Sequence, residues 1–315
     1  MKNSPPKKAV LILAGICLLF GSVSAQKAKP KRPSKPAPVA KFPIFAVTNN
    51  TGKGTVMLEP IATIENGSLA ETTQGDSGEK AVKTFQGQYY RPKTTYDLIF
   101  GGSPVGKAMV KPGDLSGECS GNRAQATLSP PNSSIKGLVM ALATNAKLTN
   151  PQPSYRRRPT AEERTEIEKL VRAELKEQDI PDAALKKLRY QNLTALDINH
   201  HGHPEFVASY STETAADRRD LLFFIAEKSA EGAYSLTYKN YEKLTPDNVM
   251  SGDVKNADGG IRHELLLDAF DYDNDGVSEI FTVLQAFEGN NFYVYKRKDG
   301  TWEKAFEGYN YHCAY

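Results

Sequence analysis

The 315 residues include 40 Lys or Arg and 37 Asp or Glu, which gives a formal net charge of +3. Residues 1–41 hold nine of the basic residues and none of the acidic ones, so residues 42–315 carry a net charge of −6. The basic character is confined to the N-terminus and excludes a basic nucleic-acid-binding domain, and we predict no nucleic-acid partner.

The first 25 residues have the three regions of an export signal. A start with three Lys residues precedes the apolar stretch Ala9–Gly21, and Val23–Ala25 has the small side chains of a cleavage site. Thirteen residues are too few to span a bilayer, which needs about 20. We predict cleavage after Ala25, export to the periplasm, the cell envelope or the medium, and no transmembrane segment in the mature chain.

Residues 26–41, rich in Lys and Pro, form a predicted extended linker. Residues 42–150 are predicted to form a β-rich domain, because apolar, β-branched runs alternate there with Gly- and Pro-containing turns. The adjacent Tyr89 and Tyr90 favour a buried strand pair over an exposed binding patch. The predicted strands are Pro43–Thr48, Thr55–Ile64, Tyr96–Phe100, Val105–Val110 and Ile135–Ala143.

Residues 151–189 form a predicted linker and helix. Thr160 and Glu163 have the spacing of a capping box, which places a helix over Ala161–Gln178. This helix has one apolar stripe, which we expect to pack on a sheet. The stripe consists of Ile167, Leu170, Val171 and Leu175.

The most informative stretch lies near the C-terminus, where the sequence has the form D-x-D-x-D-G-x-x-E. Carboxylates at alternate positions, a Gly that permits a sharp turn and a further carboxylate form an oxygen cage for a hard cation. The alternative is an acidic surface turn that binds no ion. The predicted calcium ligands are Asp271, Asp273, Asp275, Glu279 and the backbone carbonyl of Val277.

This loop differs from an EF-hand, because Thr282 stands where an EF-hand has its twelfth-position Glu and the flanks are typical of strands. It resembles the calcium loops of FG-GAP and VCBS repeats. The resemblance covers the Asp and Glu residues named above, Gly276 and the hydrophobic pair Ile280–Phe281. It implies β-propeller-like blades that bind or scaffold a partner.

A degraded copy of the loop precedes it by 74 residues without a gap, which indicates a repeated unit. His replaces the third Asp, and neutral imidazole suits calcium poorly. We expect a loop that kept its shape and lost its calcium; a transition-metal site at the neighbouring His residues is the alternative. The residues of this weaker loop are Asp197, Asn199, His201, His203 and Glu205.

We predict a mainly β fold with one helical connector. It combines the N-terminal β domain with two four-stranded, blade-like repeats in residues 190–315, separated by a polar insertion at 245–260. Two blades cannot close a propeller ring, which typically needs at least four. Either their sheets pack face to face, or the helix and the N-terminal domain cover them.

Two Cys residues remain after signal cleavage. Cys119 and Cys313 are an even pair in an exported chain, where disulfides persist, and we predict that they are linked.

No catalytic residues stand out in the sequence. Our leading prediction is an exported calcium-binding repeat protein that acts as a non-enzymatic binding or scaffolding module for a protein or glycan partner. The alternative is a secreted hydrolase with a structural calcium site. A calcium sensor needs a bistable helix pair, which strands do not provide.

Overall fold

The computed structural model describes residues 40–48, 55–74, 76–113, 121–129, 140–149, 151, 153, 156–229 and 232–312. Val39–Tyr315 form one compact unit. The predicted signal peptide, nearly all of the linker, Cys119 and Cys313 lie outside the described residues. Within those residues, no helix combines the length and the apolar character needed to cross a membrane.

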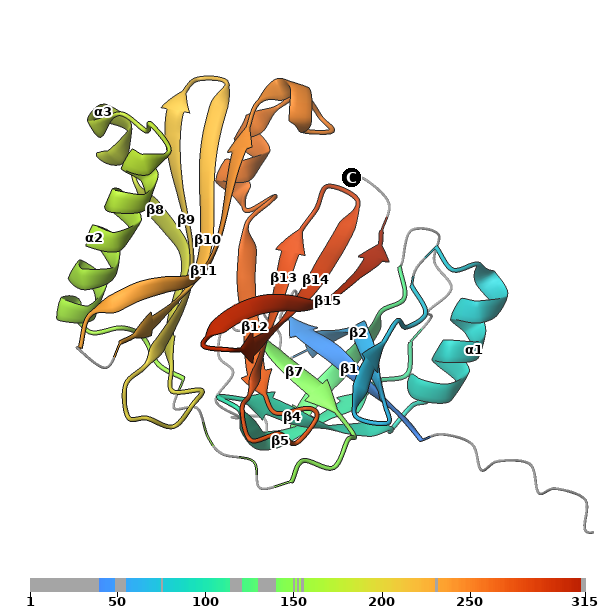
Figure 1. The fold of residues 1–315 in the computed structure, drawn as a ribbon. Coiled ribbons are helices and arrows are strands. Elements are labelled where there is room, and N and C mark those ends of the chain that lie inside the picture. Colours follow the sequence, from blue (N-terminus) through green and yellow to red (C-terminus); the bar gives the residue numbers. More distant parts are fainter. Residues whose placement is uncertain are drawn as a thin grey trace, which may run out of the picture. The chain divides into compact units, whose positions relative to one another are not determined.

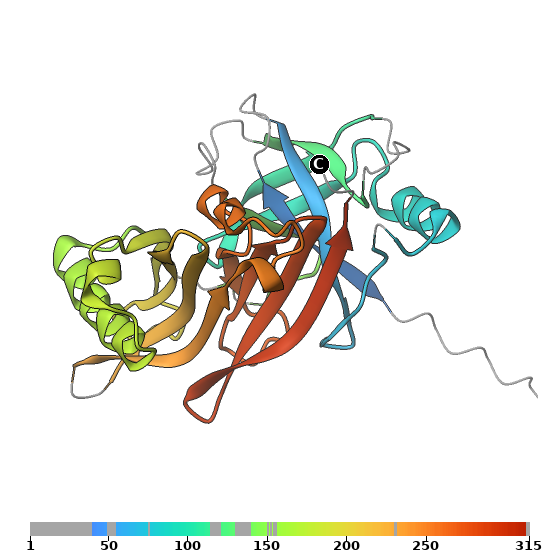
Figure 2. The same ribbon diagram turned by 90° about the horizontal axis from the view of Figure 1, so that it is seen from above.

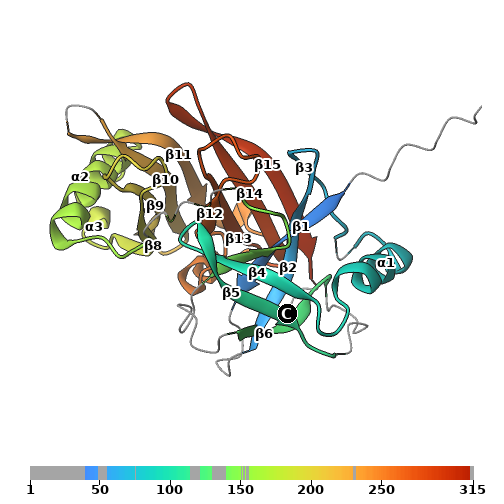
Figure 3. The ribbon, with the colours of Figure 1, turned by 90° about the horizontal axis from the view of Figure 1, so that it is seen from below.

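The N-terminal sheet is a closed, fully antiparallel barrel. Its strands follow the order β1-β7-β4-β5-β6-β2, and pairing of β1 with β2 closes the ring (Figures 1 and 3). Closure removes the open edges that a flat sheet would expose. The strands are β1 (Lys41–Thr48), β2 (Thr55–Glu65), β4 (Thr95–Phe100), β5 (Ser103–Val110), β6 (Ala124–Ser129) and β7 (Ala141–Thr144), with β3 (Ser68–Ala70) appended to β2.

Side chains alternate between the two faces of the barrel wall. On β1, Phe45 and Val47 belong to the interior cluster, whereas Ile44 and Ala46 belong to a second cluster outside. Both faces of this strand are thus buried, which explains its continuous apolar run.

Helix α1 (Glu79–Tyr89) contributes to the barrel interior and corrects one prediction. Tyr89 ends this helix instead of lying in a strand, and its carbonyl accepts a hydrogen bond from the Tyr96 hydroxyl at 2.5 Å. Phe85 is the one buried residue of α1. Val82, Phe85 and Tyr89 do have helical spacing, but this apolar stripe is short and stands among polar residues, and the sequence prediction did not include it.

The two predicted four-stranded units are confirmed as two antiparallel meanders. Between them lies an insertion with two 3-10 turns, η1 (Pro246–Asn248) and η2 (Val254–Gly259). The first sheet contains β8 (Arg189–Leu196), β9 (Glu205–Ala215), β10 (Arg218–Lys228) and β11 (Tyr234–Leu244). The second contains β12 (Glu264–Phe270), β13 (Glu279–Gln285), β14 (Gly289–Lys298) and β15 (Thr301–Tyr311).

The two repeat sheets bury their apolar faces by stacking in layers, and they do not form a propeller ring. One face of the β12–β15 sheet, with Leu267 and Phe281, packs on the outer wall of the barrel (Figures 1 and 2). Its other face, with Ile280 and Tyr295, packs on the β8–β11 sheet. Face-to-face packing and cover by the barrel therefore occur together.

The remaining face of the β8–β11 sheet is covered by α2 (Ala161–Glu177) and α3 (Asp182–Leu185). The predicted capping box is present: Thr160 Oγ1 accepts from Glu163 N at 3.2 Å, and Glu163 Oε2 accepts from Thr160 N at 2.8 Å. Ile167, Val171 and Leu175 form the buried stripe that faces the sheet.

A buried ion pair joins the barrel, the connector and the second repeat. Asp268 on β12 is fully buried and accepts from Gly101 N at 2.8 Å and Gly102 N at 3.3 Å. Arg156 Nη1 lies 3.1 Å from Asp268 Oδ2 and donates to the carbonyls of Met140 and Leu267. One carboxylate of the second repeat therefore satisfies donors from the barrel and from the connector.

We predict that Asp268→Asn lowers the free energy of unfolding by about 3–5 kcal/mol, because it leaves Arg156 buried without its counter-charge. Urea unfolding measures the change. The control is Asp97→Asn on β4, whose 2.5 Å pair with Lys107 is exposed, and it should cost about 1 kcal/mol or less. Equal effects of the two substitutions would contradict the role assigned to Asp268.

The buried carboxyl group of Glu264 makes the stability of the protein depend on pH. Burial raises its pKa from 4.5 to about 7, although the hydroxyls of Thr282 and Tyr295 donate to it. The folded protein thus favours the protonated acid, and this contribution to stability is lost as the pH rises from about 4.5 through about 7.

Glu264→Gln keeps the acceptor and removes the charge. Relative to wild type it should gain about 2–3 kcal/mol between pH 4.5 and pH 7.5, measured by urea unfolding across that range. Glu307→Gln, at an exposed position, is the control and should show no such gain. If the difference in the free energy of unfolding between wild type and Glu264→Gln does not change with pH, the pKa of Glu264 is not raised.

Candidate functional site

The acidic loop between β12 and β13 is shaped by its own backbone N–H groups. Asp271 accepts from Asp275 N at 3.1 Å and from Gly276 N at 2.9 Å. Asn274 and Gly276 have positive φ angles of 64° and 94°, which turn the chain around these carboxylates. The loop thus holds its Asp side chains in place through local hydrogen bonds.

Three of the predicted ligands meet at one point. One oxygen each from Asp271, Asp273 and Asp275 lies within 4.8 Å of the others. Calcium binds oxygens at 2.3–2.6 Å, so ligands on opposite sides of the ion are separated by about 5 Å. The observed spacing fits such a shell.

The other two predicted ligands lie beside this group. Glu279 is 1% exposed, its Oε2 accepts from Tyr272 N at 3.2 Å, and burial, together with the charge of Asp273, raises its pKa to about 8. Val277 N donates to Asp275 Oδ1 at 2.9 Å, and the Val277 side chain packs between the two repeat sheets.

A Lys side chain also enters the cage, which the sequence analysis did not foresee. Lys296 on β14 donates to Asp273, and its Nζ lies 2.8 Å from Asp275 Oδ2 and 3.5 Å from Glu279 Oε1. Burial lowers the pKa of Lys296, but its bonds to Asp273 and Asp275 outweigh this and raise it. One ammonium charge offsets only part of the charge of four carboxyl groups.

The degraded loop has the same backbone architecture at the same offset of 74 residues. Asp197 Oδ2 accepts from Gly202 N at 3.1 Å, and Glu205 Oε2 accepts from Ile198 N at 2.7 Å. These bonds match those of Asp271 with Gly276 and of Glu279 with Tyr272. His200 likewise has a positive φ, of 57°. The repeat detected in the sequence is thus also a repeat of hydrogen bonds.

The side chains of this first loop do not form a comparable cage. Among the described residues, its His and carboxylate groups form no cluster of three potential ligands. His201 and His203 are exposed, and Asn199 Oδ1 accepts from His201 N at 3.2 Å. Burial raises the pKa of Glu205 to about 7. The arrangement favours neither calcium nor a transition metal here.

Glu227 takes the place in the first repeat that Lys296 has in the second. Ala226 pairs with Phe206 as Tyr295 pairs with Ile280, so the next residue on each strand corresponds. Glu227 accepts from Trp302 Nε1 at 2.6 Å and from Arg297 Nε at 3.0 Å. Glu227 therefore connects the two repeat sheets, whereas Lys296 contacts the acidic loop.

Both loops border a cavity of about 250 Å³ next to the barrel. His200 of the first loop and Asp271 of the second line it, together with Gly102. Thr149 N donates to Asn274 Oδ1 at 3.1 Å, which fastens the second loop to the segment after β7. The acidic loop is thus part of the contact between the barrel and the repeats.

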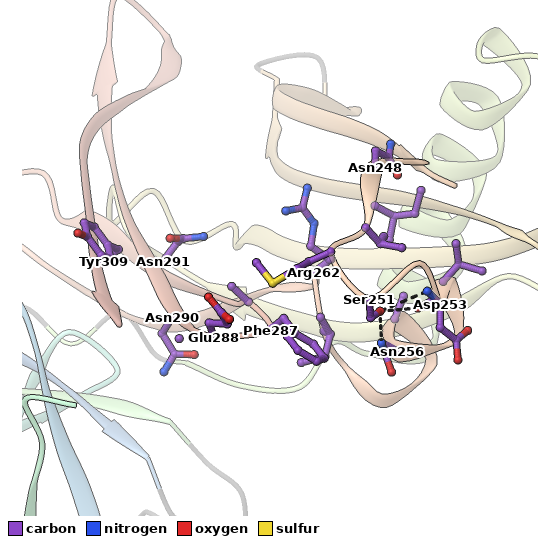
Figure 4. Close-up of a pocket in the computed structure, with 18 of the residues that line it drawn as sticks. Asn248, Ser251, Asp253, Asn256, Arg262, Phe287, Glu288, Asn290, Asn291 and Tyr309 are labelled. Carbon is purple, nitrogen blue, oxygen red and sulfur yellow. Dashed lines mark hydrogen bonds between the residues drawn. The ribbon is translucent and has the colours of Figure 1, made fainter. Parts of the chain in front are cut away.

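A second pocket, of about 210 Å³, lies between the insertion and the end of the β12–β15 sheet. Figure 4 shows Tyr309 and Asn291 together at one end and Ser251, Asp253 and Asn256 at the other. Arg262, Phe287 and Glu288 lie between these groups. The sequence analysis identified the insertion, to which Ser251, Asp253 and Asn256 belong, but it did not predict a pocket there.

A buried polar cluster also holds the end of β15 to the barrel. Glu59 accepts from Asn310 Nδ2 at 2.9 Å and Asn290 Nδ2 at 2.8 Å, and lies 2.7 Å from His312 Nε2. A Cβ on Gly121 would come within 2.7 Å of the His312 ring, so these segments touch. They are the described residues next to Cys119 and Cys313 in the sequence, whose disulfide stays a prediction.

Comparisons with protein-family models, with curated proteins and with solved structures give no match to this chain.

Lys296 provides a test that separates a calcium loop from an acidic turn neutralised by an internal cation. If the loop binds calcium, Lys296→Met removes a competing charge and should tighten calcium binding about ten-fold, or about 1.4 kcal/mol. Without calcium, the same variant should melt at a lower temperature because its carboxylates repel one another.

Isothermal titration and thermal unfolding measure both effects. Lys298→Met is the matched control on the same strand, since Lys298 is exposed and pairs with Glu303. If Lys296→Met is destabilised and calcium does not restore it, Lys296 itself is the structural cation and the calcium interpretation is wrong.

Proposed function

We propose that this chain is an exported calcium-binding repeat protein that serves as a non-enzymatic binding module for a glycan or protein partner. The observation that carries the calcium part is the convergence of Asp271, Asp273 and Asp275 within 4.8 Å, beside the buried Glu279. The resemblance of the loop to those of FG-GAP and VCBS repeats supports the same proposal.

The ion would act on stability through the position of the loop. The loop joins β12 to β13 in the middle layer of the protein and is bonded to Thr149. Neutralising its carboxylates would strengthen the layer on which both the barrel and the first repeat pack. Calcium in this role is structural, and the pocket beyond the other end of the sheet is the place for a partner.

Calcium should therefore raise the melting temperature by mass action. We expect a Kd on the order of 10⁻⁴–10⁻³ M, as for extracellular modules, and poor substitution by magnesium, which demands a tighter octahedral shell. Asp273→Ala should abolish most of the stabilisation, whereas Asn199→Ala, at the matching position of the first loop, should change it little.

Thermal unfolding of wild type and both variants, with calcium and with a chelator, checks this prediction. Equal melting temperatures of wild type in the two conditions would falsify the site. Equal effects of the two substitutions would contradict the prediction that the second loop binds calcium more strongly than the first.

A further inference from the structure

The pocket next to the insertion combines an apolar base with a polar rim. Val249, Val254 and Ala257 of the insertion, Ile261 directly after it and Phe287 of the β13–β14 turn supply apolar surface. At about 210 Å³ it is smaller than the roughly 300–1,000 Å³ of sites for drug-sized ligands. Its size suits one compact ring, with the rest of a longer ligand outside.

Two exposed aromatic rings form one wall. Tyr309 and Tyr311 are 41% and 38% exposed and lie two residues apart on β15, so they share a face of the sheet. Their partners on β14 are Asn291 and Gly289. The Tyr309 hydroxyl donates to Asp76 at 2.7 Å, which fixes the ring while leaving its face exposed. A rigid aromatic face beside an amide side chain suits a ligand with both C–H and hydroxyl groups.

The charges at the pocket argue against an anionic ligand. Glu288 and Asp253 form no ion pair within the described residues, so an anion would meet unneutralised carboxylates. Arg262 also lines the pocket, and its charge is offset by the ion pair with Glu242. Hydroxyl groups donate to carboxylates and accept from guanidinium or amide N–H groups, so a neutral polyol satisfies both kinds of partner.

Arg262 itself has an uncommon backbone conformation and an unsatisfied side-chain donor. Its φ of 71° is left-handed, which is uncommon for a residue other than Gly, and its N–H donates to Gln285 O at 2.8 Å. Its Nε is buried without a hydrogen-bond partner among the described residues. Backbone strain and an unsatisfied donor together are typical of functional positions.

We infer that this pocket binds a neutral saccharide, with a sugar ring on the face of Tyr309 and its hydroxyls bonded by Asn291, Arg262 and Glu288. The inference rests on the proposed function and specifies the partner as a glycan. No bond is made or broken, so the site retains its ligand instead of transforming it.

The test is isothermal titration of the mature full-length chain with cellohexaose, maltohexaose, xylohexaose and chitohexaose, and with hexalysine and hexagalacturonate as charged probes. At least one neutral hexaose should bind saturably, with an affinity that added salt changes little because no charge is neutralised. The charged probes should not bind at this site.

Variants assign the binding to the pocket. Tyr309→Ala should weaken it about ten-fold, as expected for an aromatic anchor, whereas Tyr309→Phe keeps the ring and should stay within about two-fold of wild type. Glu288→Gln keeps an acceptor but loses the charge-assisted bond, so it should weaken binding about three-fold. Tyr190→Ala, which removes an aromatic that is 48% exposed on the other repeat, is the control and should have no effect.

Three outcomes would overturn the inference: no neutral hexaose binds, Tyr309→Ala and Tyr190→Ala behave alike, or hexalysine binds and is lost in Glu288→Gln. The last result would indicate a basic peptide partner. The melting temperature of the same samples is measured with calcium and with a chelator. Calcium stabilisation without saccharide binding rejects only the saccharide site, whereas loss of both rejects the proposed function as well.

Discussion

Asp268 occupies a position where a carboxylate without partners would be strongly unfavourable. It is fully buried, and its oxygens accept from Arg156 and from the backbone of the β4–β5 turn at Gly101 and Gly102. Because desolvation of a charge costs several kcal/mol, these donors have to be in place together. This requirement fixes how the connector crosses the barrel and how the barrel meets the second repeat.

The same layer contains both candidate functional features. The acidic loop begins with Asp271, the residue directly after the end of β12. The pocket adjoins the opposite end of the sheet at Tyr309 and Glu288. Since β12 and β13 are buried on both faces, the loops, the turns and the exposed edge strand β15 are what remain to contact solutes. Two candidate sites at the ends of a buried layer are what the proposed binding module would need.

Lys296 and Glu227 show how two copies of one supersecondary unit can diverge. The backbone bonds that shape the two loops are conserved between the copies at an offset of 74 residues. The corresponding strand residue is a cation in one copy, where it enters the cage, and an anion in the other, where it binds Arg297 and Trp302. One repeat retains the acidic site and the other provides an anchor between the sheets.

Local patterns in the sequence determined the mainly β class, the α2 capping box, the two four-stranded units and the acidic loop, because each depends on residues a few positions apart. Helix α1 escaped prediction because its apolar stripe of Val82, Phe85 and Tyr89 is short and stands among polar residues. The entry of Lys296 into the cage, the Arg156–Asp268 pair and the pocket at Tyr309 were decided by the tertiary structure alone. They join residues that are 23 to more than 100 positions apart, and no short-range pattern specifies which distant side chains will meet once the layers pack.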